Sequence, residues 1–163
     1  MTVAEISVVN NFLDEQGCIS IICSLDFDKK VETENGFSEI QNPHSLRGIV
    51  NQITELARKE SGQIIGVKYF YTRKYVLLSE VTEHEDDRSE GGKPNGVVYS
   101  ALLYLNENFI GGDLVFTKIG MSVSPKQGQL IMFPAGSDYA HKTTRIMSGV
   151  KYILAIFFIH CDD

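Results

Sequence analysis

The chain has 163 residues, of which 43% are hydrophobic and 22% charged, a length and composition typical of one globular domain with a core of its own. Fifteen lysine and arginine residues stand against 21 aspartate and glutamate residues, so the net charge is −6 with histidine neutral. This charge repels phosphate backbones and anionic lipid, and we therefore expect neither nucleic acid nor a membrane as the partner.

Signals for export, membrane insertion and disulfide formation are not found in the sequence. No basic segment precedes an apolar run at the N-terminus, and no stretch approaches the ~18 apolar residues of a membrane span. Cys18, Cys23 and Cys161 have spacings that match no zinc or disulfide framework. These observations predict free thiols in a reducing compartment and a soluble, cytoplasmic protein.

The N-terminal stretch is predicted to form a short strand followed by a helix. Residues 4–10 alternate between apolar and polar side chains, which favours a strand. Asn10 and Asn11 then offer an N-cap for an amphipathic helix over Leu13–Leu25. The polar stretch that follows contains one plausible strand, Val31–Glu34.

A second helix is more clearly marked. Asn42 or Ser45 is the expected cap, and Ser61 with Gly62 is the expected end. Its apolar residues recur at spacings of three and four: Leu46, Ile49, Val50, Ile53 and Leu56. One side of this helix must therefore lie against an apolar surface.

After Gly62 the hydrophobic period becomes that of strands. The predicted strands are Ile64–Thr72, Lys74–Val81, Val97–Leu105, Asp113–Thr117, Met121–Ser124, Gln129–Phe133 and Val150–His160. Two helices before this series predict an α+β protein, in which a double-sheet jelly roll is covered on one face by the N-terminal helices. We expect one domain over residues 1–163, helical to about residue 62 and with its β core over about 63–160.

Residues 86–96 contain almost no apolar side chain and are predicted to form an exposed, mobile loop. Gly91 and Gly92 give this segment a possible hinge. The loop is thus a candidate for closing over a bound molecule.

The search for a metal site is small because the chain has only four histidines: His44, His84, His141 and His160. Two imidazoles and one carboxylate on one side of an ion form the facial triad of non-haem iron sites. His84 and Asp86 are two residues apart, so on an extended segment they point to the same side. Taken alone, this pair is more often a solvated acidic turn than a metal site.

Lys151 is the most unusual residue of the last strand. It shares a strand face with Ile153, Ala155 and Phe157, where a lysine is costly unless an anion meets it. The alternative is a lysine near the strand end that reaches water. On the same strand, His160 faces the opposite way and is a weak candidate ligand.

Elimination then leaves His141 as the second imidazole, in a predicted loop over Gly136–Ser148, because His44 is expected at the surface near a helix start. Tyr104 could present its phenol to the anion that a buried lysine would neutralise, or it is an ordinary core tyrosine. The pair Gly111-Gly112 by itself indicates a hairpin.

Together, these motifs resemble the Fe(II)/2-oxoglutarate-dependent oxygenases, and among them the prolyl 4-hydroxylase-like group. The resemblance runs from about Tyr75 to Ile159, and the start of the chain, Val9-x-x-Phe12-Leu13, is also similar. Its motifs are His84-Glu85-Asp86; Tyr104-Leu105-Asn106; Phe109-Ile110-Gly111-Gly112-Asp113 with Phe116; Val123-x-Pro125-x-x-Gly128 leading into Leu130–Pro134; and His141 with Gly149-x-Lys151. The resemblance implies that the jelly roll is a double-stranded β-helix.

The resemblance also implies roles for individual residues. His84, Asp86 and His141 would ligate Fe(II), while Lys151 and Tyr104 would bind the distal carboxylate of the co-substrate 2-oxoglutarate. Asp87 could compete as a ligand, although on a regular strand it points the other way. Ser79 is the candidate for the C1 end of 2-oxoglutarate, and Arg88, Lys142 and Arg145 are candidates for the rim of the substrate site.

The implied activity is hydroxylation of a C–H bond with O2, with release of succinate and CO2 and with ascorbate as an accessory reductant. A prolyl residue in a peptide or protein is the implied substrate. A free amino acid or another small molecule remains an alternative substrate. The alternative of another class is a non-catalytic jelly-roll module that only binds metal.

Overall fold

A computed structural model describes residues 5–27, 36–89 and 91–162. The strand predicted at Val31–Glu34 lies outside the described residues. The elements, in chain order, are β1 Ser7–Val9, α1 Glu15–Ser24, β2 Phe37–Gln41, a 3-10 turn His44–Leu46, α2 Arg47–Ser61, β3 Ile65–Tyr75, β4 Val81–His84, β5 Tyr99–Tyr104, β6 Phe109–Gly111, β7 Leu114–Phe116, β8 Met121–Val123, β9 Leu130–Pro134, a 3-10 turn Ser137–Tyr139, β10 His141–Thr143, β11 Ile146–Gly149 and β12 Lys151–His160.

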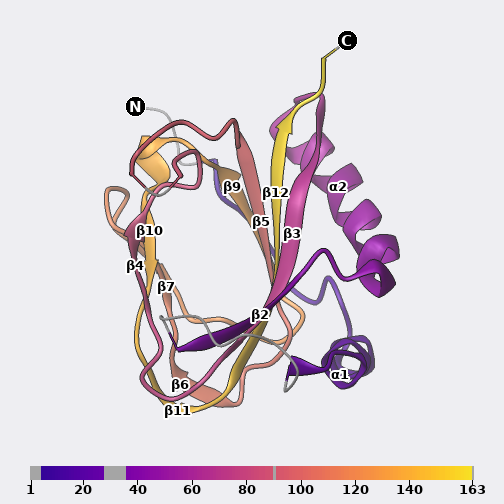
Figure 1. Ribbon diagram of the computed structural model, residues 1–163, viewed down its shortest axis with the longest axis vertical. Coiled ribbons are helices and arrows are strands. Elements are labelled where there is room, and N and C mark those ends of the chain that lie inside the picture. Colours follow the sequence, from indigo (N-terminus) through magenta and orange to yellow (C-terminus); the bar gives the residue numbers. More distant parts are fainter. Residues whose placement is uncertain (1–4, 28–35, 90, 163) are drawn as a thin grey trace.

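Two antiparallel sheets face each other across an interior, and the helices lie outside the larger one (Figure 1). The larger sheet has six strands in the order β1-β9-β5-β12-β3-β2, and the smaller has four in the order β4-β10-β7-β8. A two-stranded ribbon of β6 and β11 lies at one end of this pair. The α+β class with N-terminal helices on one sheet is therefore as expected.

Strand β12 separates the two apolar cores. Its residues Lys151, Ile153, Ala155 and Phe157 are buried, and the last three pack in the interior between the sheets. The alternate residues Leu154, Ile156 and Phe158 are buried against the helices in the other core. The predicted parity of this strand is thus confirmed, and it places the amine of Lys151 on the inner side of the larger sheet.

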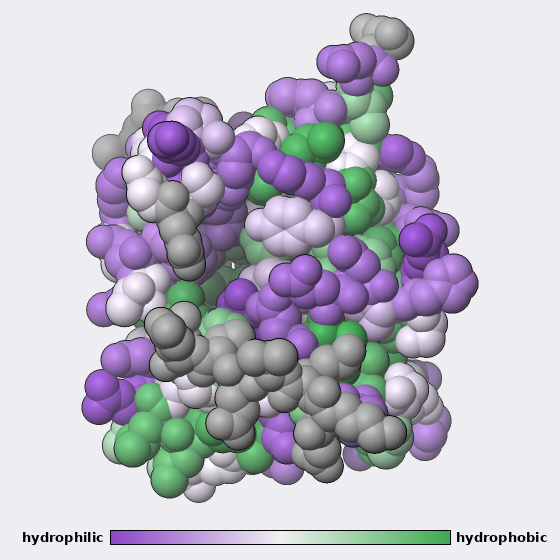
Figure 2. All heavy atoms as spheres, in the orientation of Figure 1, coloured by the Kyte–Doolittle hydropathy of each residue, from purple (hydrophilic) through white to green (hydrophobic). Residues whose placement is uncertain are grey.

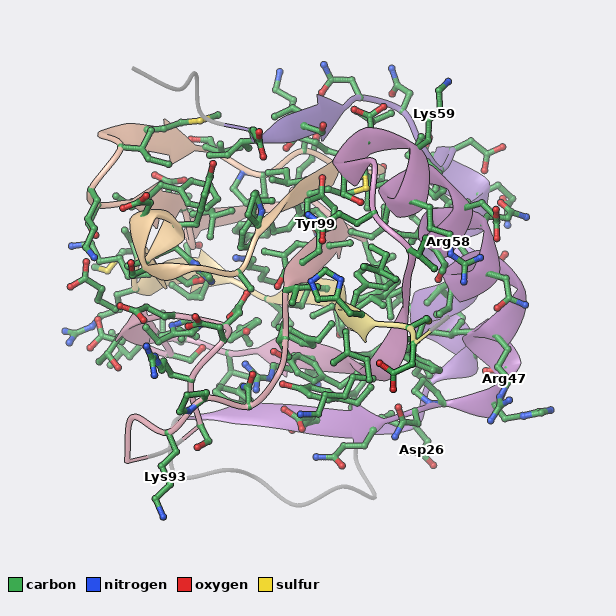
Figure 3. All side chains as sticks on the ribbon, turned by 90° about the horizontal axis from the view of Figure 1, so that it is seen from above. Asp26, Arg47, Arg58, Lys59, Lys93 and Tyr99 are labelled. Atoms are coloured by element: carbon green, nitrogen blue, oxygen red, sulfur yellow. The ribbon has the colours of Figure 1, made fainter. Side chains whose placement is uncertain are left out.

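Helix α2 covers the outer face of the larger sheet. Val50, Ile53 and Ala57 are buried in the core beneath it, whereas Lys59 points away from the sheet (Figure 3). Arg58 reaches back to β3, where its Nε donates to the carbonyl oxygen of Ile65 at 2.8 Å. Gly62 ends the helix in the left-handed conformation, with φ of 66°, as glycine does without strain.

The helix starts differ from the predictions. Neither Asn42 nor Ser45 caps α2, whose N-cap position is Leu46 without a side-chain hydrogen bond. Asn42 instead accepts a hydrogen bond from the backbone N–H of Phe70. Helix α1 is capped by Asp14, which accepts a hydrogen bond from the N–H of Gly17 at 2.7 Å, and not by Asn10 or Asn11.

The strand predictions were wrong at two kinds of place. A break was expected between Thr72 and Lys74, yet β3 is continuous through Arg73 because that cation is paired with Glu39 of β2 at 2.6 Å. The predicted strand Lys74–Val81 is mostly the turn between β3 and β4. Strands β2, β4, β6, β10 and β11 were not predicted, and β10 and β11 occupy part of the supposed loop around His141. These strands are short and partly polar, and only pairing with distant segments defines them.

The surface carries one apolar patch at the end where β6 and β11 lie, visible as green spheres at the lower left of Figure 2. The exposed apolar residues of the turn after β3 and of these two strands are Val76, Leu77, Leu78, Ile110 and Met147. Hydrogen bonds between Leu78 and Ile146, and between Ile146 and Ser79, join the turn to β11. Among the described residues, no helix is long and apolar enough to cross a membrane.

Candidate metal centre

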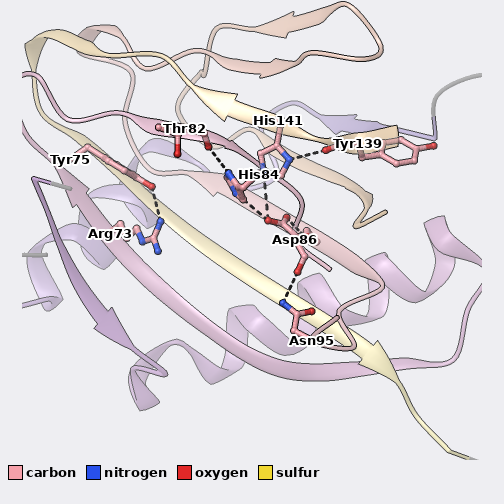
Figure 4. A network of polar contacts seen from close by, with 9 residues as sticks. Arg73, Tyr75, Thr82, His84, Asp86, Asn95, Tyr139 and His141 are labelled. Atoms are coloured by element: carbon pink, nitrogen blue, oxygen red, sulfur yellow. Dashed lines mark hydrogen bonds and ion pairs between the residues drawn. The ribbon is translucent and has the colours of Figure 1, made fainter. Parts of the chain in front are cut away.

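Two histidines face each other across the antiparallel pair of β4 and β10. His84 and His141 are register partners, and their ring centroids are 4.4 Å apart. Asp86 follows β4 by two residues, and its Oδ1 lies 3.3 Å from Nε2 of His84 and 3.6 Å from Nε2 of His141 (Figure 4). One ligand atom from each of the three residues lies within 4.8 Å of the others.

Neighbouring groups orient all three side chains. Nδ1 of His84 lies 2.9 Å from the carbonyl oxygen of Thr82, and Nδ1 of His141 lies 2.9 Å from that of Tyr139. A carbonyl oxygen only accepts, so each Nδ1 carries the proton and each Nε2 keeps its lone pair. Ser100 donates to Oδ2 of Asp86 at 2.8 Å, which leaves Oδ1 turned toward the imidazoles.

The electrostatics of the cluster favour the protonation states that a metal needs at two of the three residues, Asp86 and His141. At His84, burial lowers the pKa, but the contact with the Asp86 carboxylate outweighs burial and raises that pKa overall. Burial, the largest influence, raises the pKa of Asp86, but its contacts with the two imidazoles and the hydrogen bond from Ser100 outweigh burial and lower that pKa. Burial lowers the pKa of His141. At neutral pH the carboxylate is therefore ionised and the imidazole of His141 is neutral, as metal ligands must be.

The donor set fits a divalent iron. Two imidazole nitrogens and one carboxylate oxygen converge from three points of the chain. Asp86 and His141 are buried, while the side chain of His84 is 42% exposed and opens the site on one side. This arrangement is that of the 2-His-1-carboxylate triad, which leaves positions on the metal free. Asp87, the expected competitor, lies outside this group, with Oδ1 at 3.7 Å from Nε of Arg88.

A buried cation lies on the inner face of the larger sheet, at the start of β12. Lys151 is 1% exposed, and its Nζ donates to the carbonyl oxygen of Gly112 at 2.8 Å. The rings of Tyr104, Tyr75 and Phe109 surround Nζ, with centroids at 5.1, 5.4 and 5.9 Å. Burial lowers the pKa of Lys151 to about 7, although the charge of Asp113 opposes the shift. The sequence left two alternatives for Lys151, a buried lysine or one near the strand end that reaches water. The structure shows the buried one.

Two hollows that share several lining residues adjoin the candidate ligands. An open groove of about 810 Å³ is lined by His84, Asp86 and Arg88, with an aromatic floor that includes Tyr69, Tyr71 and Phe157. A narrower cavity touches all three ligands, and Tyr75 lies on its wall. Because Tyr75 also packs on the ammonium of Lys151, this cavity leads from the metal ligands toward the buried cation.

The other candidate residues have mixed positions. Arg88 lines the groove, but Lys142 and Arg145 do not, and Arg145 is paired with Glu80 at 3.1 Å. Ser79 donates to the carbonyl of Val76 within the turn before β4. His160 is exposed at the end of β12, and His44 lies in the 3-10 turn before α2.

Three residues of the site were not found from the sequence: Arg73, Tyr75 and Ser100. Arg73 and Tyr75 are paired in register with Ile153 and Lys151 of β12 and therefore face the same interior. The sequence showed that Arg73 and Tyr75 share one face of a strand. Only the pairing of β3 with β12 shows that this face is the inner one. Ser100 is a small polar residue in an otherwise apolar strand, but its partner Asp86 is 14 residues away, and the pattern of the strand does not identify that partner.

Comparison with known proteins agrees with this geometry. Residues 71–159, more than half of the chain, match the family described as the 2OG-Fe(II) oxygenase superfamily. The chain belongs to this superfamily. The chain is thus an Fe(II)- and 2-oxoglutarate-dependent oxygenase, with Fe(II) as its metal and 2-oxoglutarate as its co-substrate.

Similar proteins include human prolyl 3-hydroxylase 2, which is 35% identical over 65 residues. That match covers 37% of this chain and 9% of the human protein. Among solved structures, the viral collagen prolyl hydroxylase of Paramecium bursaria Chlorella virus-1, in its complex with 2OG, superposes with a TM-score of 0.79 at 16% identity, covering 97% of both chains. A Pseudomonas putida prolyl-4-hydroxylase gives 0.78 at 16% identity, covering 98% of this chain and 95% of that one. At these identities the structures establish the fold.

The buried ammonium makes the stability of the free oxygenase depend on pH. The pKa of Lys151 is about 7 in the folded state, against 10.5 as its ordinary value. The unfolded state therefore binds more protons between these values, and the cost of burying the charge grows as pH falls from about 10 to 7. Lys151→Met removes this cost. The free energy of unfolding of the variant, relative to that of the unaltered protein, should therefore rise by up to about 1.4 kcal/mol for each pH unit by which the pH falls from about 10 to 7.

Urea unfolding of both proteins without iron or 2-oxoglutarate, at pH 7, 8 and 9, measures the difference. Titrations common to the two proteins cancel in it. A difference that stays constant with pH would mean that the lysine is protonated to the same extent in both states.

Proposed function

We propose that the oxygenase hydroxylates a prolyl residue in a peptide or protein. The observation that carries this proposal is the open, aromatic-floored groove beside the metal ligands, in which the rings of Tyr69 and Phe157 stack at 4.7 Å. Aromatic-lined grooves suit extended, proline-containing segments. An open groove also favours a chain that enters and leaves over a free amino acid, which an enclosed pocket would hold better. The prolyl hydroxylases among the similar proteins support the same substrate class.

In this proposal, His84, Asp86 and His141 hold the Fe(II). When bound, the iron and 2-oxoglutarate supply the oxidation, in which O2 is consumed, 2-oxoglutarate becomes succinate and CO2, and a hydroxyl group is added to the substrate. The protein's own part is to fix geometry. The carbonyls of Thr82 and Tyr139 fix the two rings, and Ser100 fixes the carboxylate.

Lys151 would pair with the distal carboxylate of 2-oxoglutarate, and the phenol of Tyr104 would donate to it. Both groups lie at the closed end of the interior, where water is excluded and a charge pair is strong. Burial raises the pKa of the Tyr104 phenol far above its ordinary value, so it remains a donor. Tyr75, on the other side of the ammonium, is in a position to make the same kind of contact.

The architecture completes the proposal. The two facing sheets, with the metal ligands on the smaller and the cation on the larger, would form the double-stranded β-helix, or jelly roll, expected from the sequence. Residues 1–163 would then act as one catalytic domain. A non-catalytic metal-binding module is less favoured, because such a module has no use for an ammonium group buried at a cost beside the metal site.

The central test is succinate formation with Fe(II), 2-oxoglutarate, ascorbate and a library of proline-containing peptides. We expect peptide-stimulated succinate release and a mass gain of one oxygen on the peptide, both abolished in His141→Ala. His44→Ala is the matched control, because this histidine is remote from the ligands. Tight metal binding without turnover on any peptide or amino acid would support the non-catalytic module instead.

Ser100 is predicted to position the metal ligand Asp86 without touching the metal. Ser100→Ala removes the hydrogen bond to Oδ2 at a fully buried site, and we expect the affinity for Mn(II) to fall by about 10- to 100-fold. Ser100→Thr keeps the hydroxyl and should retain most of the affinity. Isothermal titration with Mn(II) measures both variants, and equal affinity in Ser100→Ala would remove the serine from the site.

The loop over residues 86–96 remains a candidate for closing over the substrate. A backbone hydrogen bond from Asn95 to Asp87 and a side-chain bond from Asn95 to the carbonyl of Asp86 tie its base to the metal site. Gly91 and Gly92 both adopt positive φ and have open space around them. Deleting residues 89–93 should raise the KM for peptide or uncouple succinate release from hydroxylation. An unchanged coupled rate would contradict this role.

A further inference from the structure

A second cation lies on the inner face of the larger sheet, two residues before Tyr75 on β3. Arg73 lines both the open groove and the narrower cavity at the metal ligands. Figure 4 shows its guanidinium group pointing toward the phenol of Tyr75, to which Nη1 donates at 3.3 Å. None of the roles assigned above uses this arginine.

Its surroundings hold the guanidinium group in one place. The rings of Phe37 and Tyr71 have their centroids 4.1 and 4.0 Å from Cζ, so the planar group is stacked on both. Glu39 accepts from Nε at 2.6 Å, and its other oxygen accepts from Gln41 at 2.9 Å. An arginine fixed by two rings and a carboxylate loses little entropy when it binds a further group.

The remaining edge of the guanidinium group is available to a ligand. Nε is bound to Glu39 and Nη1 to Tyr75, but no described residue accepts a hydrogen bond from Nη2. The side chain is 18% exposed, on the wall of a groove that also contains His84 and Asp86. A planar donor edge that is partly desolvated is suited to a carboxylate, which presents two acceptor oxygens in one plane.

We propose that Arg73 binds a carboxylate of the substrate, so that the oxygenase prefers substrates carrying an acidic group close to the hydroxylated carbon. The group could be an acidic side chain of a peptide or a free terminal carboxylate. This inference rests on the proposed hydroxylase function and adds the charge of its substrate. The distal carboxylate of 2-oxoglutarate already has a buried partner in Lys151, whereas Arg73 is the cation that also faces the open groove.

The experiment measures binding and does not depend on turnover. The protein is loaded with Mn(II) and the 2-oxoglutarate analogue N-oxalylglycine, so that the metal and the co-substrate site are filled. Two acid–amide pairs are then titrated by NMR: N-acetylproline against N-acetylprolinamide, and N-acetylglutamic acid α-amide against N-acetylglutamine α-amide. Within at least one pair the acid should bind about tenfold more tightly than the amide, because a hydrogen bond to a charged group adds that much.

Variants assign the preference to this arginine. Arg73→Gln should remove the preference for the acid, and Arg73→Lys should keep part of it. Glu39→Gln removes the competing negative charge while keeping a hydrogen-bond acceptor, so the acid should bind more tightly and the amide should not change. Arg58→Gln is the matched control, because Arg58 is also paired with a glutamate, Glu55, at 2.6 Å, but lines neither the groove nor the narrower cavity.

The proposal would be overturned by equal binding of acid and amide, by no binding of either, or by an acid preference that survives in Arg73→Gln. A fall of tenfold or more in 2-oxoglutarate affinity of the Mn(II)-loaded Arg73→Gln protein, without an effect on the acid probes, would likewise assign the arginine to the co-substrate and overturn it. Failure of the hydroxylase function appears separately, as absence of succinate formation by the unaltered protein.

Discussion

The site depends on one strand pairing, that of β4 with β10. Its register sets His84 directly opposite His141, and the irregularity that follows, between His141 and Thr143, does not disturb that pair. Side chains alternate between the faces of a strand, so a slip of one residue would turn one imidazole away from Asp86 and leave the ion with two ligands. The pairing of β10 with β7 restrains the same strand from its other edge. The ligand geometry is therefore a property of the smaller sheet as a whole.

Local patterns in the sequence predicted much of this structure. The spacing of apolar residues identified the body of α2, and the alternation along the last strand identified both cores and the inward position of Lys151. The spacing of His84 and Asp86 was sufficient to place them on one side of an extended segment. In each case the relevant neighbours lie within a few residues along the chain, where helix and strand periods determine direction.

The features that were missed depend on contacts between distant segments. His141 was expected in a loop, because β10 is only three residues long and has no apolar alternation. The break expected at Arg73 would have been reasonable for an unpaired charge, but Glu39 and two aromatic rings from other parts of the chain surround it. Asp14, and not Asn10 or Asn11, caps α1. A helix begins where a side chain can reach a free backbone N–H, and residue type alone does not determine which of several polar side chains does so.

The contact between Lys151 and Gly112 bears on which keto diacid the site can accept as co-substrate. The ammonium is held by a backbone carbonyl, and a side chain at position 112, where φ is +67°, would approach Cδ of the lysine to 3.1 Å. The ammonium group at the end of this flexible side chain is thus held in place by a backbone carbonyl group. In the proposed function, this contact would fix the point at which the far carboxylate of a bound keto diacid meets the ammonium group, so the length of the diacid would decide whether it reaches both ends of the site.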